Sequence, residues 1–205
     1  MRYFIIVLFF FTWSVNAQKI VQKTIINPNE TSILVNADNC FDVKIETAKS
    51  NKIIVEAKMA GEYSNNLSLN IHEEDKTLLV ETSFNANFEI PNDKLSAHKV
   101  VSIALKITVP ENLDVTIYGT DANVTAKGMY KNINIALNDG RCVLNAVKNR
   151  AFVKTHSGTI EVHAKSGKFN TIAKYGEIFS DKLPVSNLQY DLSTITGNIY
   201  IHKIN

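Results

Sequence analysis

The sequence predicts an all-β protein whose C-terminal half is a β-solenoid, in which short strands stack at a fixed spacing. Two observations lead to this fold class. Apolar and polar residues alternate at every second position, as in "FVKTHSGTIEVHAKSG" at 152–167, and this period is typical of strands with one buried face. The pattern of that phrase also recurs every 18 residues. No segment has the apolar period of a helix, so helical fold classes are not expected.

Small residues at the turns mark the 18-residue period. Steps of 18 from Gly158 reach Gly140 and Ala122 in one direction and Gly176 in the other, and a longer step of 21 then reaches Gly197. Equivalent residues of successive coils would stack about 4.8 Å apart, and the stacked columns would build a continuous core. The column two positions after these anchors consists of Val124, Cys142, Ile160, Ile178 and Ile199.

An antiparallel meander is the alternative to stacked coils. Asp139-Gly140 is a favourable hairpin dipeptide, and two strands joined there would also form an 18-residue unit. Coils are favoured because the turn dipeptides vary while the repeat length holds. If the coils stack in chain order, Ile160 contacts Cys142 on one side and Ile178 on the other.

Three regions are predicted: a signal peptide at 1–17, an N-terminal β region at 18–110, and solenoid coils at 111–205 that continue from it. Before residue 111 the alternation persists but the 18-residue period does not. We expect irregular first coils or antiparallel hairpins there, with turns at "KSNK" and "EEDK". The alternating segments are 41–45, 53–59, 67–71 and 101–109.

The N-terminal segment has the pattern of a secretory signal peptide. Arg2 precedes an apolar stretch of 11 residues, "YFIIVLFFFTW", and small residues precede an expected cleavage site before Gln18. The stretch is shorter than the roughly 20 residues that span a bilayer, although a retained anchor is the alternative. The sequence therefore predicts a periplasmic, extracellular or cell-surface protein that is not inserted in the membrane after cleavage.

Charge and cysteine content bear on nucleic-acid binding and on disulfide formation. Without Arg2 the chain has 21 basic and 20 acidic residues, mixed along its length, so no nucleic-acid-binding stripe is expected. The two cysteines, Cys40 and Cys142, could form a bridge in an oxidising compartment. Two separate buried thiols are favoured, because Cys142 occupies a column in which the other coils carry Ile or Val.

Four stretches of the mature chain carry a resemblance to a known family: "FDVKIETAKSNKIIVEAK", "ALKITVPENLDVTIYG", "THSGTIEV" and "TITGNIYI". The chain resembles the adhesin-like β-helical proteins of Bacteroidetes, the auto-transporter adhesin type, whose function is largely unknown. The resemblance covers roughly residues 33–203. It implies a right-handed parallel β-helix exported from the cytoplasm. It carries over no catalytic or binding residue.

Catalytic motifs are missing from the sequence. There is no G-x-S-x-G elbow, no H-E-x-x-H, no phosphate-binding glycine loop and no cysteine pair at zinc spacing. His156 and Ser157 are neighbours, and neighbours in an extended strand point to opposite faces. We therefore expect a protein that is not an enzyme and has no cofactor. A carbohydrate-active enzyme of the polysaccharide lyase type is the alternative, although lyases need longer coils than these.

Outward positions in the last coils give one candidate binding surface. If the coils stack, a file of two histidines and an aspartate lies beside a glutamate and two aromatic rings, with neighbours about 5 Å apart. Such a strip could contact a sugar or a protein surface, could hold a metal, or could be only a solvated ladder. No metal site is assigned. The predicted strip consists of Phe179, Tyr200, Glu161, His163, Asp181 and His202.

The leading hypothesis is an exported, noncatalytic β-solenoid that acts as an adhesin-like interaction scaffold. Its partner would be an unidentified protein or glycan at the cell envelope, bound by avidity across a rigid face. The last coil, "IYIHKIN", has no capping segment after it, so self-association through that edge is a further expectation.

Overall fold

The computed structural model describes residues 18–26, 31–88 and 101–204, and over these residues the fold is all-β. The strands form one 15-stranded sheet, and a single 3₁₀ turn, Ser64–Asn66, is the only helical element in this part of the chain. No described helix has the length and apolar character needed to cross a membrane. The predicted signal peptide at 1–17 lies outside the described residues.

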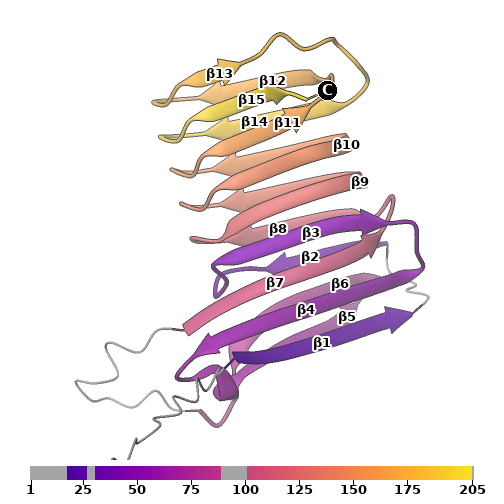
Figure 1. Ribbon diagram of the computed structural model, residues 1–205, viewed down its shortest axis with the longest axis vertical. Helices are drawn as coiled ribbons and strands as arrows, with labels where there is room; N and C mark the ends of the chain where they lie inside the picture. Colours follow the sequence, from indigo (N-terminus) through magenta and orange to yellow (C-terminus); the bar gives the residue numbers. More distant parts are fainter. Residues whose placement is uncertain (1–17, 27–30, 89–100, 205) are drawn as a thin grey trace, which may run out of the picture.

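The sheet folds back on itself and nearly encloses the core, so its strands form two opposing layers (Figure 1). We call these layers the first face and the second face of the molecule. The two longest strands, β9 (Asn123–Leu137) and β10 (Cys142–Thr155), run through both faces and join them. The first face has the order β1 (Gln18–Ile26), β4 (Lys52–Gly61), β7 (Val101–Pro110), β3 (Asp42–Ala48), β9, β10, β11 (Ile160–Ala164), β15 (Ile199–Lys203) and β13 (Ile178–Ser180). The second face has the order β5 (Leu67–Glu74), β6 (Thr77–Phe84), β2 (Ser32–Asn36), β8 (Asp114–Gly119), β9, β10, β14 (Gln189–Thr194) and β12 (Lys168–Ala173).

The core lies between the two faces and consists of the inward side chains of the alternating strands. These side chains belong to one continuous apolar cluster that extends from the N-terminal strands to β15. Val124, Cys142, Ile160 and Ile199 follow one another in register and are all fully buried. The period of two in the sequence therefore identifies the buried positions, because successive strand residues point to opposite faces of the sheet.

The prediction of a right-handed parallel β-helix with 18-residue coils is wrong, because the structure is a single mixed sheet. Among the described strands, three pairs are antiparallel: β1 with β4, β4 with β7, and β5 with β6. Asp75 and Lys76 have positive φ angles of 47° and 63°, which lets a two-residue turn reverse the chain between β5 and β6. Alternation has the same period in parallel and antiparallel strands, so it does not reveal the direction of pairing. The antiparallel meander is also wrong for 123–203, because β9, β10 and β11 pair in parallel.

The predicted chain order of stacking is wrong at the C-terminal end. Ile160 pairs with Cys142 as predicted, but its other neighbour is Ile199, and Ile178 lies beyond Ile199. The second face shows the same order, since β14 lies between β10 and β12. The last two strands are thus inserted between earlier ones: β15 lies between β11 and β13, and β14 lies between β10 and β12. The connection at 181–188 is longer than the neighbouring turns, which gives the chain the length to return.

Glycine at the turns is required by the close approach of one turn to the next. A Cβ added at Gly158 would overlap the carbonyl oxygen of Gly140, and one added at Gly176 would overlap that of Gly197. Gly197 itself would meet the carbonyl oxygen of Gly158, so the turns follow the same inserted order as the strands. The anchor glycines found in the sequence therefore mark backbone contacts between turns.

The open edge at the C-terminal end of the sheet is not the one predicted. β15 pairs with strands on both of its sides, whereas β12 and β13 each pair with a single strand among the described residues. Ile178 of β13 is consequently 44% exposed, although Ile199 beside it is fully buried. The end of the core is therefore open at β12 and β13.

The two cysteines are buried and are not bonded to each other. Burial raises the pKa of the Cys40 thiol to about 11 and also raises the pKa of Cys142. The favoured expectation of two separate buried thiols is confirmed.

Candidate functional site

The predicted strip lies on the outer side of the first face, at its C-terminal end. The register places Glu161 of β11 beside Tyr200 of β15, and Tyr200 beside Phe179 of β13. His163 lies beside His202 in the next outward row. The side chains on β11 and β15 point outward because Val162 and Ile201, which stand between them in sequence, are buried in the core. Phe179 takes the same outward position on β13, in register with Tyr200. We call the six predicted residues the aromatic–polar strip.

Aromatic rings stack along the aromatic–polar strip. The rings of Phe179 and Tyr200 are nearly parallel, with centroids 5.0 Å apart, and those of His163 and His202 are 5.1 Å apart. The centroids of Tyr200 and His202 are 6.3 Å apart. Neighbouring strands lie about 4.8 Å apart, so in-register outward rings come into stacking contact without leaving the sheet geometry. The result is a flat aromatic platform on a rigid backbone.

Glu161 links the platform to a charged partner. Its carboxylate accepts a hydrogen bond from the Arg141 guanidinium and another from Nε2 of His163, at 2.7 Å. The Arg141 hydrogen bond is the largest influence and holds the pKa of Glu161 below its usual value, with a smaller contribution from His163. Partial burial of Glu161 opposes this effect. Glu161 therefore stays ionised at neutral pH.

The predicted file of His163, Asp181 and His202 does not form in that order. The two histidines are direct neighbours, and Asp181 lies beyond His202, where its carboxylate accepts the backbone N–H of Lys203 at 2.8 Å. The inserted strand order is the reason, since it places β15 between β11 and β13. Among the described residues, no group of three or more His, Cys, Asp or Glu side chains could hold a metal ion.

A polar concavity of about 640 Å³ adjoins the aromatic–polar strip. Tyr200, His202 and Glu161 form the side that belongs to the strip. The remaining lining comes from the turns and strand starts beside it: Asn123, Asp139, Arg141, Ser157 and Thr159. The concavity thus offers hydroxyl, amide, carboxylate and guanidinium groups beside an aromatic surface. This set can form hydrogen bonds with a hydroxyl-rich or peptide-like ligand.

Comparisons with known proteins agree with the fold. The chain matches no protein-family model and no curated protein. It is similar to the solved structure of a protein from Clostridium sporogenes, provisionally described as a cell adhesion protein, with 14% identity over 91% of this chain and 100% of the other, and a TM-score of 0.66. At this identity the likeness shows a shared fold alone.

Two other solved structures are also similar, at lower TM-scores. A provisionally described adhesin from Bacteroides fragilis has 12% identity over 91% of this chain and 97% of the other, with a TM-score of 0.40. A provisionally described lipid-binding protein from Parabacteroides distasonis has 11% identity over 90% of this chain and 97% of the other, with a TM-score of 0.32.

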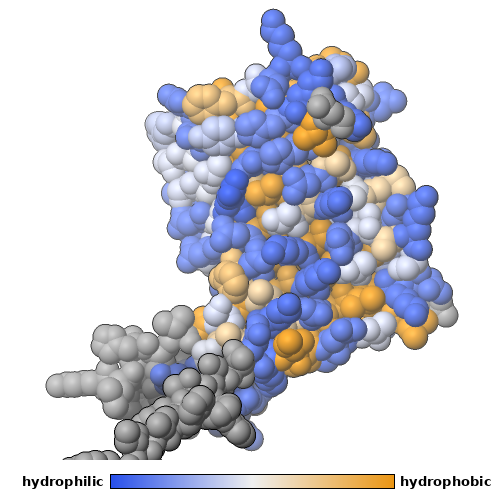
Figure 2. Space-filling model, in the orientation of Figure 1, coloured by the Kyte–Doolittle hydropathy of each residue, from blue (hydrophilic) through white to orange (hydrophobic). Residues whose placement is uncertain are grey.

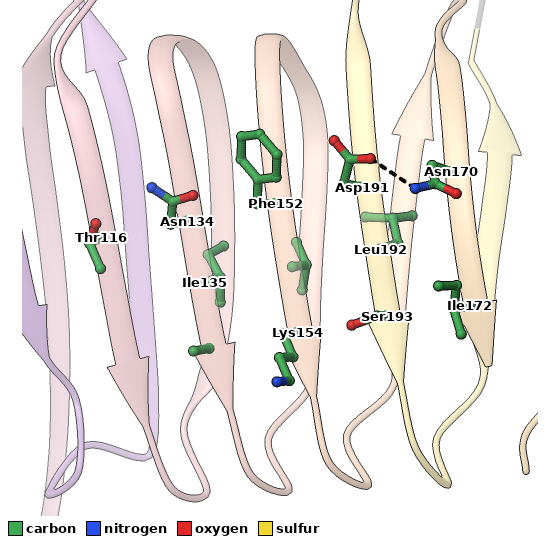
Figure 3. Close-up of a pocket in the computed structure, with 12 residues that line it drawn as sticks. Thr116, Asn134, Ile135, Phe152, Lys154, Asn170, Ile172, Asp191, Leu192 and Ser193 are labelled. Carbon is green, nitrogen blue, oxygen red and sulfur yellow. Dashed lines mark hydrogen bonds between the residues drawn. The ribbon is translucent and has the colours of Figure 1, made fainter. Parts of the chain in front are cut away.

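A second concave surface, outside the predicted strip, lies on the second face (Figure 3). It runs across β8, β9, β10, β14 and β12 and has a volume of about 320 Å³. The sequence contains a pattern that indicates this surface. The outward residues six positions before the turn anchors are polar except for one phenylalanine. That column consists of Thr116, Asn134, Phe152, Asn170 and Asp191.

Proposed function

We propose that the protein is an exported, noncatalytic interaction module, adhesin-like in its role, that binds a protein or glycan of the cell envelope through the aromatic–polar strip. The observation that carries this proposal is the stacked pair of outward rings, Phe179 and Tyr200, beside a polar concavity. Phe179 is 45% exposed, so its ring is available to a partner. Aromatic rings beside polar groups suit both sugars and protein surfaces.

The rigidity of the sheet supports binding by a preformed surface. Tyr200 lies on β15, which is paired on both sides, and its ring stacks on neighbours in two directions. A ligand therefore does not have to order these side chains, and this lowers the entropic cost of binding. Polar and apolar areas are interspersed over the visible surface in Figure 2, which fits several modest contacts and avidity.

Export is part of the proposal and is supported by the N-terminal sequence pattern. The expected locations are the periplasm, the extracellular space and the cell surface. Cleavage before Gln18 would be shown by N-terminal sequencing of the protein recovered from the envelope fraction. Full-length protein in the cytoplasm would contradict this part.

Arrays of glycans and of envelope proteins, probed with the mature protein, test the binding role. We expect a Phe179→Ala, Tyr200→Ala double variant to lose about tenfold or more in affinity for the partner that the wild type binds. Ile20→Ala is the matched control, because Ile20 is 58% exposed on β1 at the opposite end of the sheet. Equal binding by the double variant would contradict the role of the strip. Shortened fragments of a bound glycan would instead support the carbohydrate-active enzyme.

Self-association is proposed at the open edge formed by β13. An antiparallel pair of β13 strands, with its two-fold axis between Phe179 and Ser180, would place Glu177 of one copy opposite Lys182 of the other. It would also bring the exposed Ile178 side chains close to the new interface. Light scattering should show dimers at high concentration, and Phe179→Lys with Ile178→Lys should shift the protein to monomers. A wild-type protein that is monomeric at every concentration would contradict this pairing.

A further inference from the structure

Two outward rows of side chains form the walls and floor of the concavity on the second face, which we call the cross-strand groove (Figure 3). The backbone register sets corresponding residues of β8, β9, β10, β14 and β12 side by side. The first row is Thr116, Asn134, Phe152, Asp191 and Asn170, and the second row is Ala136, Lys154, Ser193 and Ile172. Five strands at about 4.8 Å spacing give the groove a length of roughly 20 Å.

The cross-strand groove exposes an apolar side chain at its centre and another at one end. Phe152, on the central strand β10, is 36% exposed, and Ile172, on the last strand β12, is 59% exposed. Ala136 lies in register between Tyr118 and Lys154, whose side chains are much longer, so its methyl group leaves a hollow. The groove therefore presents one aromatic ring and a small apolar depression beside it. Such a surface suits the apolar faces of flat, ring-shaped ligand units.

Polar groups stand at intervals along the same row. The Asn170 amide donates to one carboxylate oxygen of Asp191 at 3.2 Å, and Gln189 donates to the other at 2.9 Å. Each carboxylate oxygen keeps lone-pair capacity for a ligand hydroxyl. None of the hydrogen bonds made within the described part of the chain involves the side-chain amide of Asn134, so its two N–H donors and its carbonyl acceptor are available. The row thus offers donors and acceptors together.

We propose that the cross-strand groove binds an extended, uncharged polysaccharide that lies across the strands. Sugar rings have apolar faces for Phe152 and hydroxyl groups for Asn134 and Asp191. The binding groups recur at the strand spacing of about 4.8 Å, so the ligand should be a chain of repeating units rather than a single sugar. Lys154 and Asp191 carry opposite charges and balance each other, which favours a neutral chain.

Other polymers fit the cross-strand groove less well. An extended peptide laid across the strands would leave its own N–H and C=O groups without main-chain partners. The backbone N–H and C=O groups of the strands lie in the plane of the sheet and bond to neighbouring strands, so they do not point into the groove. A nucleic acid would need several cationic side chains for its phosphates, and Lys154 is the one cation among the lining residues. A polysaccharide meets neither obstacle.

This site is separate from the aromatic–polar strip, which lies on the other face. Binding in the groove can therefore be lost while binding at the strip persists, and each proposal can fail alone.

Affinity gel electrophoresis of the mature protein with soluble polysaccharides tests the inference. The probes are galactomannan, arabinoxylan, hydroxyethylcellulose and dextran, with heparin and polygalacturonate as charged comparisons. We expect at least one neutral probe to retard the wild type, and its hexasaccharide to compete at lower concentration than its monosaccharide. Phe152→Ala should weaken that interaction about tenfold. Ala136→Gln, which fills the hollow, should weaken it to a similar degree.

Matched controls keep the result specific. Phe41→Ala removes another exposed aromatic ring, on the segment that enters β3 of the first face, and should bind as the wild type does. Tyr200→Ala should also leave this interaction unchanged, because it alters the strip only. Absence of retardation by all four neutral probes would overturn the inference. It would also be overturned by full binding of both groove variants, or by retardation with the charged probes alone.

Discussion

Replacement of Gly158 by alanine tests the stacking of the turns. A Cβ at this position would fall about 1 Å inside the 3.0 Å that real Cβ atoms keep from other atoms, and the atom it meets is the backbone oxygen of Gly140. The two turns would have to separate by that amount. Overpacking of this kind costs about 1–3 kcal/mol. The separation also strains the hydrogen bond from the Ser157 N–H to the Asn138 oxygen, 2.9 Å long, and such a bond is worth about 1 kcal/mol.

We therefore expect Gly158→Ala to lower the free energy of unfolding by about 3 kcal/mol. With a urea dependence of about 2 kcal/mol per molar for a chain of this size, the unfolding midpoint should fall by about 1.5 M. Circular dichroism during a urea titration measures this change. Ser157→Ala is the control, because Ser157 is exposed in the same turn, and it should change stability by less than about 0.5 kcal/mol. A Gly158→Ala protein as stable as the control would refute the close approach of the turns.

Three further predictions concern titratable and buried groups. The folded-state pKa of Glu161 lies below its ordinary value of 4.5, so the stability it supplies is present above about pH 4.5 and is lost as pH falls through the lowered pKa. In acid unfolding, Glu161→Gln should lose less stability than the wild type over this range, and equal losses would contradict the interaction. Cys40 and Cys142 are buried, and we expect them to react with a thiol reagent only after unfolding; rapid labelling of the native protein would contradict their burial. Tyr130 is fully buried and its hydroxyl lies 3.0 Å from the Ile45 oxygen, so Tyr130→Phe should cost about 1–2 kcal/mol in a urea titration, whereas no change would mean that this bond is not made.

Alternation in the sequence identifies the buried side of each strand but not its partner. Val124, Cys142 and Ile160 stack as predicted, because equal turns join these strands and each next strand takes the adjacent place. Ile178 does not stack on Ile160, because Ile199 takes that place. Two isoleucines at equivalent positions have the same shape and hydrophobicity, so the sequence pattern does not reveal which of the two strands lies next to Ile160. The path of the connection at 181–188 decides the order.

The same limit explains the outcome for the predicted strip. The contacts of Phe179 with Tyr200 and of His163 with His202 form because both members of each pair occupy equivalent outward positions. Asp181 is displaced from between the histidines by the inserted strand. Arg141 is missing from the predicted strip because it lies in the turn before β10, one position after its anchor, whereas its partner Glu161 stands three positions after its own anchor. Comparing only residues that stand at the same distance from their turn anchors does not reveal a contact between residues at different distances.

The order of the C-terminal strands is the central claim, and engineered disulfides test it most directly. His163 and His202 are paired residues of adjacent strands, and their Cα atoms should be about 4.8 Å apart, within the usual disulfide range. Asp181 is one strand further away, at roughly twice that distance, which is too far for a bridge. Under mild oxidation, we predict that His163→Cys with His202→Cys forms a bridge, detected as a cross-linked peptide by mass spectrometry, and that His163→Cys with Asp181→Cys does not. A bridge in the second variant and none in the first would contradict the inserted order and restore stacking in chain order.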